Sequence, residues 1–200
     1  INSYMYGNAM ALAEMNRLSG DNAKAEGYSK EAAGLKKLIE EKLWNKKHEF
    51  FETLKNDTAA DVREAIGFIP WYFNMPDAKT YDAAWKQVTD EKGFAAPYGL
   101  TTCERRSPLF RTHGTGTCEW DGAVWPFATS QTLTAMGNYI NNYPTPILGS
   151  KEFFHNMEVY VESQHHRGRP YIGEYLDETN GAWLMGDRER SRYYNHSTFN

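Results

Sequence analysis

The sequence predicts an all-α protein built from helical hairpins, and the evidence begins with its first 44 residues. Apolar and aromatic side chains recur at helical spacing over residues 2–19 and again over residues 21–44. Gly20 and Asp21 separate the two runs, as expected of an antiparallel helical hairpin with Asp21 as the N-cap of its second helix. No set of segments carries the alternating pattern that a major β-sheet requires.

Further helices are expected in the rest of the chain. The spacing of apolar residues predicts helices at about 80–89, 121–139 and 151–164, and the segment 188–200 leads into another. Pro126 is compatible with the second of these helices only within its first turn. Paired helices of this kind fit an α/α toroid in which each hairpin packs on the next, and a compact helical bundle is the alternative.

Two long loops separate these helices. Residues 91–119 and 168–187 are rich in glycine and polar residues, and loops of this length in a compact domain are usually functional. Before them, residues 48–54 are expected to be extended, and residues 61–73 to form a short helix or turn. We therefore look for the functional residues in the two loops.

Composition limits the class of protein. The chain has 200 residues, of which 40% are hydrophobic and 24% charged, as in a globular protein of one domain. The net charge of −4 argues against a nucleic-acid partner. No apolar run approaches the roughly 20 residues of a membrane helix, so none is expected. Aromatic residues reach 14%, which suits either an aromatic core or a sugar-binding surface.

The segment 118–131, Cys-Glu-Trp-Asp-Gly-Ala-Val-Trp-Pro-Phe-Ala-Thr-Ser-Gln, is the strongest local feature. Trp120 and Trp125 offer flat platforms for a ligand, and Gly122 would let the backbone approach it closely. Asp121 could accept hydrogen bonds from sugar hydroxyls. The alternative is an ordinary helix N-cap at Asp121 with both tryptophans in the core.

A second feature is the segment Tyr-Ile-Gly-Glu-Tyr-Leu-Asp-Glu-Thr-Asn-Gly at residues 171–181. Glu174 lies between a glycine and Tyr175, and a carboxylate held near aromatic walls can acquire the altered proton affinity of a catalytic group. The alternative is a solvent-exposed acidic loop.

Other polar residues are weaker candidates for a site. Glu104, Arg105 and Arg106 could hydrogen-bond a polar substrate, or could pair with the acidic groups of the protein itself. His196 could lie near a pocket, or could cap the last helix. Cys103 and Cys118 fit no metal spacing, and we expect free thiols, with a disulfide as the alternative.

No metal or cofactor is expected from the sequence. It contains no zinc-type ligand spacing, no glycine-rich phosphate loop and no Gly-x-Ser-x-Gly nucleophile turn. A chemistry carried by side chains alone is therefore the simplest expectation.

Two segments resemble a known group of enzymes. Residues 120–131 resemble the Trp-x-Gly-x-x-Trp-Pro segment of mannosylglycerate-hydrolase-like and family 63 glycoside hydrolases, and trehalases carry a related stretch. Residues 173–181 resemble their late segment containing Glu, Tyr and Thr-Gly, here with Asn180 before the glycine. Residues 63–73 and 195–199 are most similar to a bacterial branch that includes β-L-arabinofuranosidases.

The resemblance implies an (α/α)6 toroid, of which residues 1–200 would form the C-terminal portion of one catalytic domain. It also implies hydrolysis of a glycoside or oligosaccharide with inversion, with Glu174 as the general base. In this clan the general acid is usually an Asp in an earlier segment, and Asp121 is the fallback within these residues. Trp71 would bound the sugar site with the two other tryptophans, and Tyr175 would contact substrate.

Some expectations concern the whole protein. Both ends of the sequence look cut, so we expect a fragment of a longer chain. Relatives of the bacterial branch are usually exported, which implies a periplasmic or secreted enzyme. Two alternatives remain: a carbohydrate-binding or scaffold module without catalysis, and a protein-interaction toroid with a large apolar patch in place of a concave acidic pocket.

Overall fold

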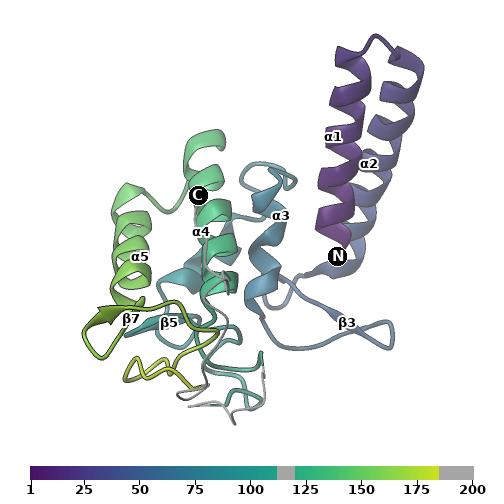
Figure 1. Ribbon diagram of the computed structural model, residues 1–200. Helices are drawn as coiled ribbons and strands as arrows, with labels where there is room; N and C mark the ends of the chain where they lie inside the picture. The colour runs from purple at the N-terminus through teal and green to yellow at the C-terminus, as the bar shows by residue number, and fades with distance from the viewer. Residues whose placement is uncertain (112–119, 185–200) are drawn as a thin grey trace.

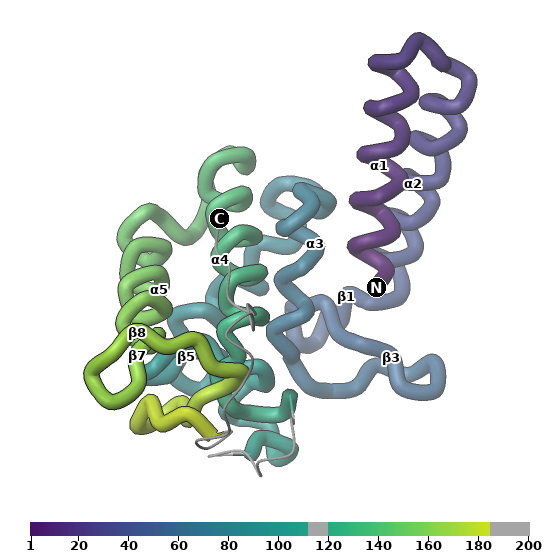
Figure 2. The backbone as a smooth tube through the Cα atoms, in the orientation of Figure 1, coloured from purple at the N-terminus to yellow at the C-terminus, as the bar shows by residue number. Residues whose placement is uncertain are grey.

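The computed structural model describes residues 1–111 and 120–184, and its helices stand side by side with most connecting loops gathered at one end (Figures 1 and 2). The helices are α1 (Asn2–Leu18), α2 (Asn22–Leu43), α3 (Ile69–Tyr72), α4 (Pro126–Asn142) and α5 (Ser150–Ser163), with 3-10 helices η1 (Ala65–Phe68) and η2 (Asp82–Val88). Within the described ranges, none of these helices has the length and apolarity needed to cross a membrane.

The helices α1 and α2 form the predicted hairpin, which projects to one side of the other helices (Figure 1). Gly20 makes the turn with a φ of 86°, a conformation that glycine adopts without strain. The Asp21 carboxylate accepts the backbone N–H of Lys24 at 3.1 Å, which confirms the predicted N-cap. Small buried residues such as Ala9 and Ala32 let the two helices approach closely.

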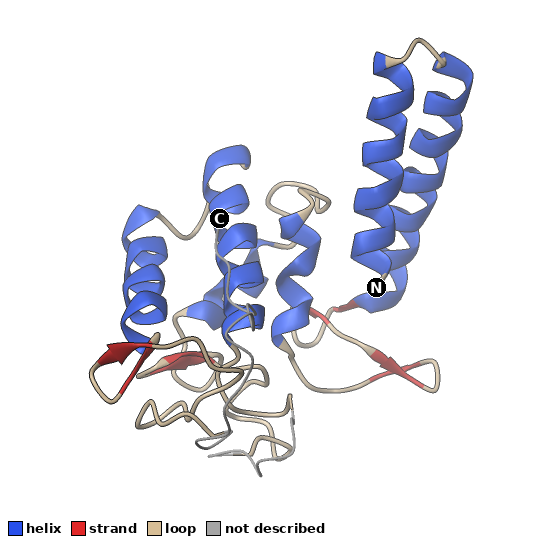
Figure 3. Ribbon diagram, viewed as in Figure 1, coloured by secondary structure: helices blue, strands red, loops and turns tan. Residues whose placement is uncertain are grey.

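In the described residues the strands are short, and they form two-stranded antiparallel sheets at the loop end of the helices (Figure 3). The pairs are β1 (Trp44–Asn45) with β2 (Phe50–Phe51), β3 (Leu54–Lys55) with β4 (Thr58–Ala59), β5 (Ala95–Ala96) with β6 (Gly99–Leu100), and β7 (His165–His166) with β8 (Arg169–Pro170). The all-α class is confirmed for the described residues. His165 and His166 form β7 shortly after α5 ends at Ser163.

The main core is a cluster of aromatic rings between α3, α4 and η2. Trp85 is stacked between Phe68 and Tyr139, with ring centroids 4.8 and 5.0 Å away. Trp71 meets Trp85 edge to face at 5.3 Å, and both indoles are 0% exposed. The segment that carries Trp85, expected to be a helix at about 80–89, is the 3-10 helix η2.

Helix α4 begins at Pro126, five residues later than the predicted start at 121. The delay has a tertiary cause: Val124 pairs with Leu176, and each residue donates its N–H to the other's carbonyl, at 3.0 and 2.9 Å. This pairing keeps the backbone before Trp125 extended, so Asp121 is not the N-cap. Pro126 occupies the first turn, as predicted.

Trp85→Ala should lower the free energy of unfolding of the whole protein by about 3–5 kcal/mol, because it empties the centre of the aromatic core. Trp120→Ala is the matched control, and it should cost roughly 1 kcal/mol because that indole is 45% exposed. Urea unfolding followed by circular dichroism measures both. Equal losses in the two variants would contradict this account of the core.

Candidate active site

Three aromatic rings form a stack beside the loop end of α4. The ring centroids of Trp120 and Trp125 are 4.1 Å apart, and those of Trp125 and Tyr175 are 4.8 Å apart, with interplanar angles of 22° and 12°. Trp125 and Tyr175 are buried, whereas Trp120 at the end of the stack is about half exposed. One face of Trp120 lies against Trp125, and Phe127 meets the same indole edge to face.

The backbone holds the two halves of this stack together. Val124 and Leu176 pair as described, and Leu176 also pairs with Trp183. After them, one carboxylate oxygen of Asp177 accepts the N–H groups of Thr179 and Asn180, at 2.8 and 3.1 Å, which closes a turn. The segments that contain Trp120 and Glu174 are therefore fixed relative to each other.

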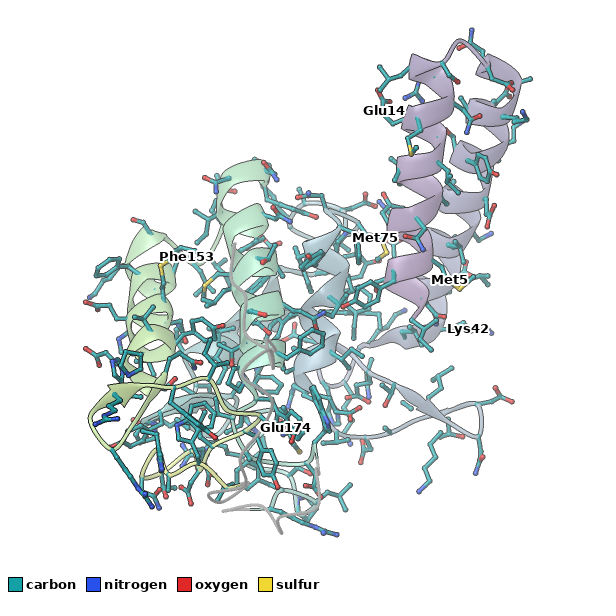
Figure 4. The ribbon with its side chains drawn as sticks, in the orientation of Figure 1. Met5, Glu14, Lys42, Met75, Phe153 and Glu174 are labelled. Carbon is teal, nitrogen blue, oxygen red and sulfur yellow. The ribbon has the colours of Figure 1, made fainter. Side chains whose placement is uncertain are left out.

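Glu174 is half-buried and immediately precedes the stacked ring of Tyr175. Figure 4 places it among the loops, at the opposite end of the structure from Glu14 in the first hairpin. Gly173 leaves no room for a side chain, because a Cβ there would lie 2.2 Å from the Trp183 ring. The packing of Trp183 against Gly173 thus fixes the backbone beside Glu174.

The exposed side of Trp120 lines a pocket of about 430 Å³. Its walls include residues of α1, the loop at Thr53, the start of η1 and the start of α4. The lining residues are Ile1, Tyr4, Thr53, Glu64, Ala65, Ile66, Ile69, Thr102, Trp120, Phe127, Ala128 and Gln131. Glu174 is not among these described lining residues; the stack connects its neighbour Tyr175 to Trp120 through Trp125.

Sequence analysis did not single out three polar residues of this pocket. Tyr4, Glu64 and Gln131 lie far apart in the chain, and Gln131 donates its side-chain N–H to the Tyr4 hydroxyl. Burial raises the pKa of Tyr4 above its usual value, and the bond from Gln131 opposes this shift. No local pattern marks these residues, because contacts between segments that are distant in the sequence bring them together.

The structure corrects the role expected for Trp71. Its indole lies inside the aromatic core, against Phe51, Trp85 and Tyr139, and has no exposed surface for a sugar. Trp125 and Tyr175 are also buried, so they support the exposed ring and do not form platforms themselves.

Glu104, Arg105 and Arg106 bind parts of the protein itself. The Glu104 carboxylate is buried and pairs with Arg63 at 2.5 Å and with Arg106 at 3.2 Å. Arg105 donates to the carbonyls of Glu91 and Ala95 and lines a different cavity, between η2, the β5–β6 hairpin and α5. Their polar groups hold loops together, as in the alternative that the sequence left open, and substrate binding by these three residues stays a prediction.

Asp121 and Gly122 are also structural. Asp121 pairs with Arg111 at 3.0 Å, and its carbonyl accepts the N–H of the same residue. A Cβ on Gly122 would lie 1.9 Å from the carbonyl oxygen of Arg111. The glycine therefore admits a neighbouring protein segment, where the sequence suggested a ligand.

Three candidates from the sequence remain: His196, Cys118 and Cys103. His196 and Cys118 lie outside the described residues. Cys103 is a buried free thiol whose pKa burial raises to about 12. Within residues 1–111 and 120–184, no group of three or more His, Cys, Asp or Glu side chains is arranged to hold a metal ion.

Comparison with known proteins decides the family. Residues 1–197 match the model of the mannosylglycerate hydrolase MGH1-like glycoside hydrolase domain. The chain belongs to this family. A solved structure described as a sialidase is 66% identical to this chain, with a TM-score of 0.96. The match covers 100% of this chain and 18% of that one.

Two further relatives are more distant. The GH63 mannosylglycerate hydrolase from Thermus thermophilus, solved in complex with glucose, is 19% identical with a TM-score of 0.67; the match covers 91% of this chain and 42% of that one. This likeness confirms the fold of an incomplete α/α toroid. The periplasmic trehalase of Salmonella typhimurium is 32% identical over 109 residues, 54% of this chain and 19% of the trehalase. This chain thus matches about a fifth of the length of that trehalase.

The family match weakens the expectation of a protein-interaction toroid. That alternative predicted an apolar patch in place of a concave pocket, and the structure has a pocket at Trp120. Exposed apolar side chains do occur on α1, at Met5, Met10, Met15 and Leu18.

Glu104→Gln should lower the free energy of unfolding by about 3 kcal/mol, because it leaves the buried Arg63 guanidinium without its charged partner. Asp121→Asn breaks the more exposed pair with Arg111, and this matched control should cost about 1 kcal/mol or less. Chemical unfolding of the whole protein measures both. A raised KM with unchanged stability in Glu104→Gln would restore that residue as a substrate ligand.

Proposed function

We propose that this chain supplies one wall and the general base of the active site of an inverting glycoside hydrolase. The observation that carries the proposal is the ring stack, which has the half-exposed Trp120 at one end and Tyr175, the neighbour of Glu174, at the other. Membership of a glycoside hydrolase family supports the reaction class.

The open face of Trp120 suits a sugar ring. An indole packs against the apolar C–H face of a pyranose or furanose, while the hydroxyls at the rim of the sugar remain free for hydrogen bonds. The stacked rings of Trp125 and Tyr175 hold Trp120 from behind, so little side-chain freedom is lost when a sugar binds.

Glu174 would act on water. In an inverting hydrolase a carboxylate removes a proton from a water molecule as the water oxygen attacks the anomeric carbon, and a carboxylic acid donates a proton to the departing glycosidic oxygen. The two carboxyl groups stand about 6.5–9.5 Å apart to leave room for the water. We assign the base to Glu174 and the acid to an Asp outside these 200 residues. The fallback acid within these residues is Asp121, whose carboxylate pairs with Arg111 at 3.0 Å.

The substrate we propose is a glycoside or oligosaccharide in the bacterial envelope or outside the cell. Glucose is bound in the related Thermus mannosylglycerate hydrolase, and the related trehalase is periplasmic. The names of the relatives refer to different sugars, so the proposal extends to the class of substrate only.

Glu174→Gln in the whole protein should lower kcat by at least about a hundredfold while substrate binding survives, because the amide cannot accept the proton of the attacking water. Glu162→Gln, on the exposed side of α5, is the control and should leave kcat unchanged. Hydrolysis of an oligosaccharide panel gives both rate constants. Near-normal turnover in the Glu174 variant would remove this residue from the mechanism.

The stereochemistry of hydrolysis tests the inverting assignment. The first-formed sugar should carry the opposite anomeric configuration from the substrate, because water attacks the face opposite the leaving group. NMR spectra recorded in the first minutes of reaction, before mutarotation, distinguish the two anomers. Retained configuration would require a covalent intermediate and a different pair of carboxylates.

A further inference from the structure

The Trp120 pocket contains a carboxylate that the proposed proton transfers do not use. Glu64 immediately precedes η1 in an extended conformation, with φ −120° and ψ 146°. Its backbone pairs with Cys103, which holds the residue in place at the pocket wall.

The Glu64 carboxylate has a neutral hydrogen-bond donor beside it. One of its oxygens accepts a hydrogen bond from the Thr53 hydroxyl at 2.7 Å. In the part of the chain that the structure describes, no lysine, arginine or histidine forms an ion pair with Glu64. The adjacent Arg63 points elsewhere, to the Glu104 carboxylate and the His48 carbonyl.

The other polar groups of the pocket complement this acceptor. The Tyr4 hydroxyl and the Gln131 amide bond each other across the junction of α1 and α4. Most of the wall is apolar, and it includes Trp120 and Phe127, whose rings meet edge to face with centroids 6.4 Å apart. The pocket therefore combines a largely apolar surface with a few polar groups, among which Glu64 is a carboxylate, and its described lining side chains include no lysine, arginine or histidine.

We propose that Glu64 determines specificity by accepting hydrogen bonds from the hydroxyls of a neutral sugar ring stacked on Trp120. An ionised carboxylate accepts hydrogen bonds only, through two oxygens, and sugar hydroxyls are the donors that match it. The same charge repels a sugar that bears its own carboxylate. This inference rests on the proposed function, because both require a sugar on Trp120, but it gives Glu64 a role separate from Glu174.

The experiment measures binding and not turnover. Isothermal titration of the whole protein with D-glucose, D-galactose, D-glucuronate and D-galacturonate compares each neutral ring with its own uronate. A hydrogen bond to a charged group changes affinity by about tenfold or more. Wild-type protein should therefore bind at least one neutral sugar at least about tenfold more tightly than the matching uronate.

Glu64→Gln should reduce this ratio by at least about tenfold, because the amide keeps the shape and the Thr53 contact but loses the charge. Thr53→Val removes the hydroxyl donor and keeps the carboxylate, so it should retain the discrimination. Glu162→Gln is the surface control. In wild-type protein, added salt should weaken the rejection of uronates, a result that needs no variant.

Three results would overturn the proposal for Glu64: equal binding of neutral and acidic sugars by the wild type, an unchanged ratio in a folded Glu64→Gln protein, or no binding of any of the four sugars up to their solubility limits. The outcome is independent of the hydrolysis assay. If Glu64→Gln does not change the ratio of neutral-sugar to uronate affinity, the proposed role of Glu174 in hydrolysis still stands. If Glu174→Gln has normal turnover, the affinity ratio still tests the role of Glu64.

Discussion

The stack of Trp120, Trp125 and Tyr175 is the interaction on which the candidate site depends. It joins two loops that are about 50 residues apart in sequence, and the backbone pairing of Val124 with Leu176 fixes their register. The stack determines which tryptophan face is open to a ligand. The position of Glu174 follows from the same contact, because the neighbouring Tyr175 ring is held in the stack. The ring stack and the backbone pairing together hold the two loops in a fixed relation to each other.

The aromatic residues of this protein form two separate groups with different roles. Those around Trp85 and Trp71 fill the space between α3, α4 and η2, where their large apolar area stabilises the fold. Those around Trp120 form a wall at the loop end. Composition suggested an aromatic core or a sugar-binding surface, and the structure has the core together with a separate exposed indole. The sequence placed Trp71 in the wrong group because a tryptophan in a core and one on a surface have the same local sequence signature.

The charged residues of the 91–111 region illustrate a second difficulty. Glu104, Arg105 and Arg106 look like substrate ligands when read as a tripeptide, because three charged side chains in a loop suggest a polar binding site. Their partners are Arg63, Asp90 and the carbonyls of residues 91, 92 and 95, which lie 10 to 41 residues away. Pairing over such distances cannot be read from spacing. Glu64, by contrast, follows an arginine that would ordinarily be taken as its partner, and remains without an ion pair in the described ranges.

The sequence alone determined the helical class, the first hairpin with its Asp21 cap, the position of Pro126 in a first turn and the two motifs that indicate a glycoside hydrolase. These features depend on residues within a few positions of one another, where helical periodicity, capping and proline geometry act. The tertiary structure decided which tryptophan is exposed, where α4 begins, and which of the charged side chains are already paired. It also brought Tyr4, Glu64 and Gln131 into one pocket. Burial and pairing across the fold depend on contacts between distant segments, and no local pattern encodes them.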